Sequence, residues 1–184
     1  MTSVIDWEYM KINTEHYKLI HHVFLRACDT MLHLLQKAQD FAKEKNLTEA
    51  EVLAGKLALD MFDFKKQVQV FSDNAAGAVA RGAGLEKPSM PDTEKSFDEL
   101  VARLQKTREF ILSVDPEKIP DPESLKIKLG WMPAGKYFTA HAYLGDFVLQ
   151  NTLFHLTIAY AILRNMGANI GKSDFVGNLE MLSE

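Results

Sequence analysis

The sequence predicts an all-α fold, a four-helix bundle, and two observations lead to this prediction. Apolar residues recur at three- and four-residue steps over four long stretches, which is the spacing of one face of an α-helix. Segments rich in proline and glycine separate these stretches, and such segments interrupt helices. With 184 residues, 47% of them hydrophobic, the chain can build one core. We therefore predict a single domain over residues 1–184, with its core at about 14–178.

The first two predicted helices follow from these stripes. A helix from about residue 14 to 45 carries Ile20, Phe24, Ala27, Met31, Leu34, Ala38 and Phe41 on one face. A second helix is predicted to open at Thr48, because Thr48 and Glu51 have the spacing of a capping box. Its inner face would consist of Leu53, Leu57, Met61, Phe64, Val68, Phe71 and Ala75. The glycines of AAGAVARGAG end it.

The second half of the chain predicts two more helices and a hairpin. Ser96 and Glu99 form another capping-box pair, and the helix that they open ends before Asp115. LKIKLGWMPAGKYF alternates apolar and polar residues, which predicts a short β-hairpin before the last helix. That helix spans about 140–166, with Thr139 as its cap and Gly167 at its end. The ends of the chain, 1–12 and 178–184, are expected to be loosely held.

Composition excludes several classes of partner. The formal net charge of −4 and the scattered basic residues argue against nucleic-acid binding, which needs clustered Lys and Arg. Cys28 is the only cysteine, so no intrachain disulfide can form and a reducing compartment is indicated. The first ten residues lack the basic and apolar regions of a secretory signal. Polar residues such as Asp146 and Arg164 interrupt the apolar run at 140–166, which argues against a membrane span. We expect a cytoplasmic protein.

Polar residues occur where the helical stripes should be apolar. Asn151 and His155 lie one turn apart on the inner face of the last predicted helix, and Asp60 falls on the inner face of the second. A buried polar group needs a partner, because leaving it unsatisfied costs about 1–3 kcal/mol. One interpretation is a divalent-metal or small-ligand site formed by Asp60, Asn151 and His155, supported by Gln67 and Thr152. The other is a buried Asp60–His155 pair without metal.

The last predicted helix has more apolar surface than one face of a bundle can hide. Large side chains spread over its flanks: Tyr143, Phe147, Leu149, Phe154 and Leu156. A second subunit would cover them, which predicts a homodimer through this helix. The alternative is that the hairpin and the C-terminal segment fold over it.

Two strings carry a resemblance to a known family. LALDMFDFKKQVQVFSDNAAGAVARGAG and NTLFHLTIAYAILRNMGANIGKSDF resemble an uncharacterised bacterial domain-of-unknown-function family within the DinB/YfiT-like superfamily of metal-dependent four-helix bundles. The match extends over roughly residues 16–178. It implies a long crossover between the second and third helices, and a homodimer. Lys172 and Asp174 in the second string are expected to hold the C-terminal segment against the last helix.

The resemblance also implies a metal site of three histidines, one on the second helix and two at i, i+4 on the last. His155 lies nine residues before Arg164 and matches the last of them. Asn151 then takes the preceding position, and Asp60 or a close neighbour takes the position on the second helix. No histidine occurs between residues 34 and 140, so the ligand set departs from the family pattern toward oxygen donors, which suit harder ions.

Two functions compete. One is a metal-dependent thiol transferase or hydrolase, in which His155, Asp60 and Asn151 hold a divalent metal ion that activates a water. The other is a non-catalytic binding bundle, dimeric through the last helix, which keeps the inner polar groups as a network. We favour a DinB-like bundle with a degenerate inner metal or ligand site and no assignable reaction.

Overall fold

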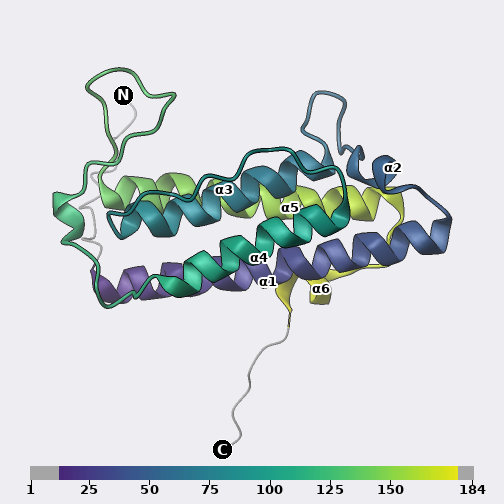
Figure 1. Ribbon diagram of the computed structural model, residues 1–184, viewed down its shortest axis with the longest axis horizontal. Helices are drawn as coiled ribbons and strands as arrows, with labels where there is room; N and C mark the ends of the chain where they lie inside the picture. The colour runs from purple at the N-terminus through teal and green to yellow at the C-terminus, as the bar shows by residue number, and fades with distance from the viewer. Residues whose placement is uncertain (1–12, 178–184) are drawn as a thin grey trace, which may run out of the picture.

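The computed structural model describes residues 13–177, and they are mainly helical (Figure 1). The predicted all-α class is confirmed; the predictions for 1–12 and 178–184 lie outside the described residues. In chain order the helices are α1 Thr14–Lys45, α2 Glu49–Leu53, α3 Phe64–Gly82, α4 Phe97–Ser113, η1 Pro122–Ser124, η2 Ala142–Val148, α5 Leu149–Met166 and α6 Lys172–Val176.

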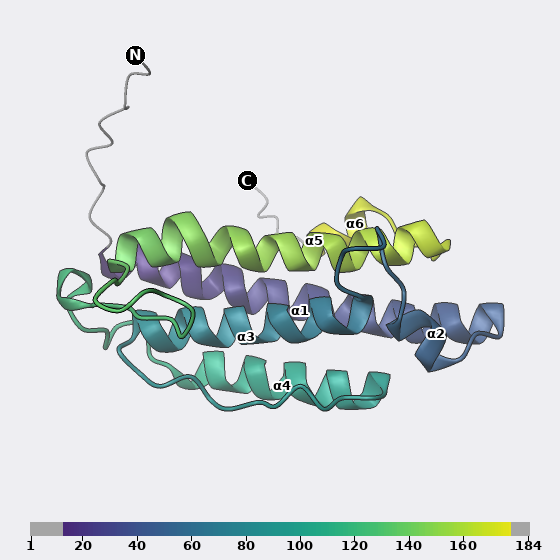
Figure 2. The same cartoon turned by 90° about the horizontal axis from the view of Figure 1, so that it is seen from above.

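Four long helices, α1, α3, α4 and α5, run side by side along the molecule (Figures 1 and 2). The chain leaves α3 at one end of the molecule and runs back along α4 before α4 begins (Figure 2), so a long crossover joins them. α3 contacts α5, α4 and α1, and Figure 2 shows it between α5 and α4. Polar groups on opposite sides of α3 therefore meet different helices.

The apolar stripe predicted for residues 14–45 forms the centre of the core. Phe24, Met31, Leu34 and Ala38 of α1 are almost completely buried. The helix begins at Asn13, whose side chain accepts a hydrogen bond from the His16 N–H, and ends at Asn46 with a φ of 55°. Periodicity and end signals agree here, which explains why the prediction for this helix was accurate.

The prediction of one continuous second helix from Thr48 was wrong. Thr48 and Glu51 do form the predicted capping box, but α2 lasts only five residues, and α3 starts again at a second cap, Asp63. Between them a loop leaves the bundle and returns, closed by a 2.8 Å hydrogen bond from the Phe64 N–H to the Gly55 carbonyl. A Cβ at Gly55 would collide with side chains of α5. The backbone at Gly55 therefore packs directly against α5, in space that a side chain at this position would otherwise occupy.

The last helix begins and ends as predicted, but its first part has a different geometry. The Thr139 hydroxyl accepts from the Ala142 N–H at 3.2 Å, and Gly167 ends the helix with a φ of 98°. Residues Ala142–Val148 form a π-helix, a wider coil that frequently occurs at functional sites. Neither apolar periodicity nor helix-end signals predict such a segment.

The segment predicted as a hairpin contains one antiparallel bridge, between Ile127 and Phe138. Each of the two residues donates its N–H to the other's carbonyl, at 2.9 and 2.8 Å. The residues between them form a loop instead of paired strands. Within residues 13–177, no helix has both the length and the apolar character needed to cross a bilayer.

Candidate functional site

His155 lies in α5 with its imidazole against α3. The residue is buried, with 6% of its surface exposed, in agreement with the inward direction expected from the sequence. Its Nδ1 lies 2.6 Å from Oε1 of Gln67. Gln67 stands at the start of α3 because the Asp63 cap begins the helix just before it. The loop between α2 and α3 thus determines which residue meets His155.

The hydrogen bonds of Gln67 determine which nitrogen of His155 carries the proton. The Gln67 Nε2 donates to the backbone carbonyl of Phe62 at 3.2 Å, so its Oε1 is the atom that accepts from His155. Nδ1 of His155 therefore carries the hydrogen, and in the neutral ring Nε2 keeps a lone pair. No described residue hydrogen-bonds Nε2, and Nε2 is not among the buried atoms that lack a partner. It therefore keeps access to solvent.

Burial and two phenyl rings surround this imidazole. Burial lowers the pKa of His155, because desolvation disfavours the charged ring. The Phe62 ring stacks on it with centroids 6.5 Å apart, and Phe154 meets it edge-on at 5.3 Å. Both phenylalanines are exposed by about half, 52% and 50%. The site is thus a neutral hydrogen-bond acceptor set in an apolar surface.

The two neighbours of His155 on α5 differ in their surroundings. Thr152 is completely buried, but its hydroxyl donates to the Val148 carbonyl at 2.7 Å, so it is satisfied within its own helix. Asn151 is half-buried one turn before His155, and its side chain has no hydrogen-bond partner among residues 13–177. Of the two supporting residues expected from the sequence, Gln67 contacts His155 through a hydrogen bond, and Thr152 is engaged elsewhere.

Asp60 does not lie on the inner face of a helix, and the prediction of its position was wrong. It lies in a turn of the loop between α2 and α3 and is exposed. It lines a shallow pocket of about 430 Å³ together with Lys56, Lys65, Lys66 and Asp92. Apolar residues in this region have the 3.6-residue spacing of a helix, but they lie in a loop and its leucines are exposed, Leu59 by 96%. A buried Asp60–His155 pair is therefore excluded.

These residues do not fit the three-histidine metal site that the resemblance implies. Gln67 is the residue that α3 presents to His155, and its Oε1 accepts from the imidazole N–H. Asn151 offers only an amide, a weak ligand for the metals that imidazole prefers. Within residues 13–177, no group of three or more His, Cys, Asp or Glu side chains could hold a metal ion.

A buried charge cluster that was not predicted from the sequence lies on the other side of α3. Arg103 of α4 is only 3% exposed, and its guanidinium forms ion pairs with Asp73 at 3.1 Å, Asp92 at 3.0 Å and Glu94 at 2.9 Å. Its Nε also donates to the Ser72 hydroxyl at 3.1 Å. One signal was available: Arg103 directly precedes Leu104 within the apolar stripe of the helix. Its partners Asp92 and Glu94 lie in the crossover, where no periodic pattern in the sequence indicates which residues become buried.

Asp92 and Glu94, two of the carboxylates around Arg103, are held in their charged form. Burial opposes the ionisation of Glu94, but hydrogen bonds from Arg103 and Gln69 outweigh it and lower the pKa of Glu94. Burial likewise opposes the ionisation of Asp92, and Lys66 and Arg103 lower its pKa. Every charge in the cluster has a partner of opposite sign, which identifies a structural clamp between the crossover and α4.

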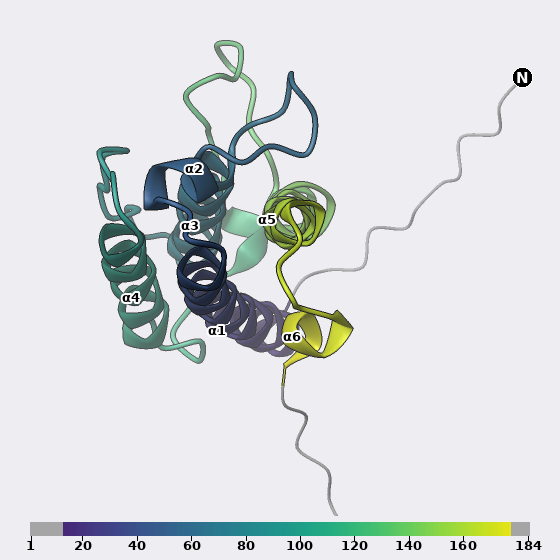
Figure 3. The same cartoon turned by 90° about the vertical axis from the view of Figure 1, so that its right-hand side faces the viewer.

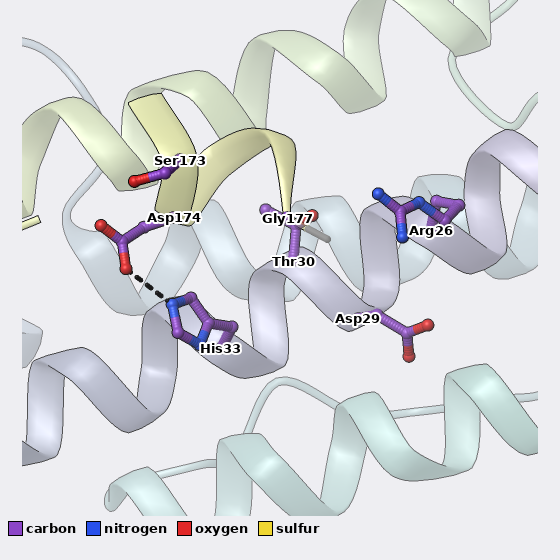
Figure 4. A pocket seen from close by; sticks show the side chains of 7 residues that line it. All are labelled: Arg26, Asp29, Thr30, His33, Ser173, Asp174 and Gly177. Atoms are coloured by element: carbon purple, nitrogen blue, oxygen red, sulfur yellow. Dashed lines mark hydrogen bonds and ion pairs between the residues drawn. The ribbon is translucent and has the colours of Figure 1, made fainter. Parts of the chain in front are cut away.

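A third polar region lies between α1 and α6 (Figure 4). This pocket of about 410 Å³ is lined by Arg26, Asp29, Thr30, His33, Ser173, Asp174 and Gly177. The hydrogen bond from His33, at 2.8 Å, is the main cause of a lowered pKa at Asp174, followed by the Gly171 N–H. Asp174 was expected to hold the C-terminal segment against the last helix, but its side chain binds α1 instead. These contacts fasten α6.

Comparisons with known proteins agree with this fold. The structure is similar to a crystal structure of a DinB family member protein from Shewanella denitrificans, with a TM-score of 0.86 and 26% sequence identity. The match covers 94% of this chain and 100% of that chain. The protein is therefore a DinB-like helical protein.

The family follows from a second comparison. The model of a domain of unknown function, DUF1993, matches residues 16–176. The chain belongs to the DUF1993 family, which confirms the resemblance seen in the two sequence strings. A comparison with curated proteins finds no match.

Proposed function

We propose that this protein is a cytoplasmic four-helix bundle that binds a small ligand, with His155 as a hydrogen-bond acceptor and not as a ligand of a catalytic metal ion. The observation that carries the proposal is the 2.6 Å contact between His155 Nδ1 and Gln67 Oε1. In this contact the side chain that α3 presents to His155 is an amide that accepts from the imidazole N–H, and Nε2 keeps a lone pair.

The surroundings of Nε2 indicate the chemistry of the ligand. A neutral imidazole accepts from a hydroxyl, amide or thiol, and Phe62 and Phe154 provide apolar surface on two sides of the ring. A ligand that combines one hydrogen-bond donor with an apolar body would satisfy both features. Asn151, one turn before His155, would offer a second polar contact.

The proposal includes a homodimer through α5. Leu153 and Phe154 are exposed by 37% and 50%. At the ends of this helical segment, Phe175 packs on Tyr160 and Trp131 lies 5.8 Å from Phe147. The C-terminal segment and the loop before η2 thus cover parts of this surface, and a second copy would cover the exposed middle.

The alternative is a metal-dependent thiol transferase or hydrolase. The observation in its favour is that Nε2 of His155 is available, with the Asn151 amide one turn away. Asp60 would then have to reach the site from its exposed loop.

Elemental analysis of protein purified without an affinity tag or chelator separates the two functions. We expect metal-free protein, and a long-range ¹H–¹⁵N spectrum in which the His155 proton resides on Nδ1. His155→Ala and the control His22→Ala, an exposed position on α1, would be prepared alongside. Stoichiometric metal that disappears in His155→Ala and persists in His22→Ala would overturn the proposal in favour of the metalloenzyme.

A further inference from the structure

An arginine without an anion lies at the other end of the contact between α3 and the last helix. Arg81 donates from Nη1 to the Tyr143 hydroxyl at 2.8 Å, and its guanidinium carbon is 5.7 Å from the centre of the Tyr143 ring. Arg81 is half-buried, and it forms no ion pair with a carboxylate of the described chain. A partly desolvated cation without a counter-charge is unfavourable. Its remaining donors can still bind an anion.

Gly77 makes room for this guanidinium. Gly77 lies one turn before Arg81 on the same face of α3 and is buried. A Cβ at this position would collide with Nη1 of Arg81. The guanidinium therefore lies directly against the helix backbone at Gly77, and a larger residue there would have to displace it.

Asn74 adds an unpaired donor on the same face. It lies three residues before Gly77, and its Nδ2 is buried with no hydrogen-bond partner in the described structure. Buried amide nitrogens almost always have a partner, because leaving one unpaired is costly. Asn74 lies two turns before Arg81 on the same face of α3. The unpaired amide and the unbalanced guanidinium together indicate a binding partner that residues 13–177 do not supply.

Tyr143 supplies a third donor. Its hydroxyl oxygen accepts from Arg81, so its own hydrogen remains available. Burial raises the pKa of Tyr143, which keeps the hydroxyl protonated at neutral pH. The residue belongs to the π-helical segment η2, and its ring packs with Phe138 and Phe147 at 6.3 and 6.2 Å.

We infer that Arg81, Asn74 and Tyr143 form a binding site for the carboxylate of a small molecule, between α3 and η2. The available groups are donors and one of them is charged, so their complement is an anion with two acceptor oxygens. The neighbouring rings favour a carboxylate that carries an aromatic body. Arg81 follows Gln67, the partner of His155, by fourteen residues of α3, about 21 Å along a helix, so the Arg81 site is separate from the one proposed at His155.

Titration of benzoate into the ¹⁵N-labelled full chain, followed by NMR, tests the inference. We expect saturable shifts of the Arg81 Nε–H and of the Asn74 side-chain amide, with a Kd of about 1 mM or lower. Arg81→Gln and Asn74→Ala should each weaken binding by about tenfold or more. Arg26→Gln is the matched control, because Arg26 is also half-buried and also donates to a neutral oxygen, the Val176 carbonyl. It should leave binding unchanged, as should His155→Ala.

Three outcomes would overturn the inference. The first is the absence of saturable shifts, and the second is unchanged benzoate affinity in Arg81→Gln. The third is equally tight binding of inorganic phosphate at the same residues, which would indicate a general anion site. If Arg81→Gln does not fold, Tyr143→Phe provides the same test, because it removes one donor and keeps the ring. The response of His155→Ala separates this site from the proposed function, since either site can fail without the other.

Discussion

The two sides of α3 carry polar clusters of opposite character. Toward α4, Arg103 is surrounded by Asp73, Asp92 and Glu94, and each charge has a partner. Toward α5, Gln67 and His155 share one short hydrogen bond, and Nε2 keeps its lone pair. Both clusters are buried, so burial alone does not distinguish a structural site from a functional one. The two clusters differ in whether the hydrogen-bond network leaves an acceptor or donor atom free to bind a ligand.

The two clusters also differ in what they hold in place. Arg103 connects α3 and α4 to the crossover through Glu94, Asp92 and the Pro91 carbonyl. His155 connects α5 to the loop before α3, because Gln67 also binds the Phe62 carbonyl. Loss of the first should therefore affect the whole fold, whereas loss of the second should affect one loop and one surface.

Arg103→Met should destabilise the protein by about 3 kcal/mol, because Glu94, whose side chain is only 10% exposed, loses the cation that pairs with it. The free energy of unfolding in urea measures this. The matched control is Arg108→Met on the same helix, because Arg108 pairs with Asp29 at 2.7 Å and both side chains are more than a third exposed. We expect that control to cost less than about 1 kcal/mol. Similar losses in the two variants would show that the Arg103 cluster is not a structural clamp.

Gln67→Leu should cost about 1–3 kcal/mol, because the Nδ1–H of His155 then lacks its acceptor. Combining it with His155→Leu should recover most of this loss, since both polar partners are then gone. A double-mutant cycle in urea measures the coupling. If the double variant is as stable as the wild type or more so, the pair is not required for folding, as expected for a ligand site. Additive losses in the two single variants would contradict the contact.

The sequence was sufficient where local signals agreed. The stripe of α1, the capping box at Thr48, the cap residue Ser96 and the end at Gly167 all predicted what the structure contains. At Ser96 only half of the predicted capping box forms, because the Glu99 carboxylate accepts from the Lys95 N–H instead. The second helix failed because Leu53, Leu57 and Phe64 keep helical spacing across a loop. Local signals conflicted there, since Gly55 and the second cap residue Asp63 both indicated an interruption.

The candidate site was predicted only in part, because local signals identify residues within one helix but not their partners on another. His155 could be identified from its own helix, but its partner depended on where α3 begins, so Asp60 was chosen in place of Gln67. The Arg103 cluster brings α4 together with residues 83–96, and only tertiary structure creates such a contact. The donors around Arg81 depend on a π-helical turn at Tyr143, which has no sequence signal.

Stability should depend on pH through His155 to a smaller extent. The folded state lowers the pKa of this imidazole below its usual 6.5, so in this pH range the unfolded chain binds more protons than the folded one. Stability should therefore decrease as the pH falls below about 6.5 toward the folded-state pKa. The urea unfolding free energies of wild type and His155→Gln at about pH 7 and about pH 5 measure this. We expect the wild type to lose more stability than the variant, and an equal loss would mean that His155 is not desolvated.

The smallest expected effect on stability is that of Phe62→Ala, because half of this side chain is already exposed. We expect less than about 1 kcal/mol. The variant should nevertheless raise the pKa of His155 toward its ordinary value, since removal of the stacked ring admits water to the imidazole. An NMR titration of the His155 ring measures this, with Leu59→Ala, 96% exposed on the same loop, as the control. An unchanged His155 pKa in Phe62→Ala would mean that the rest of the bundle causes the desolvation, and that this loop does not control access to Nε2.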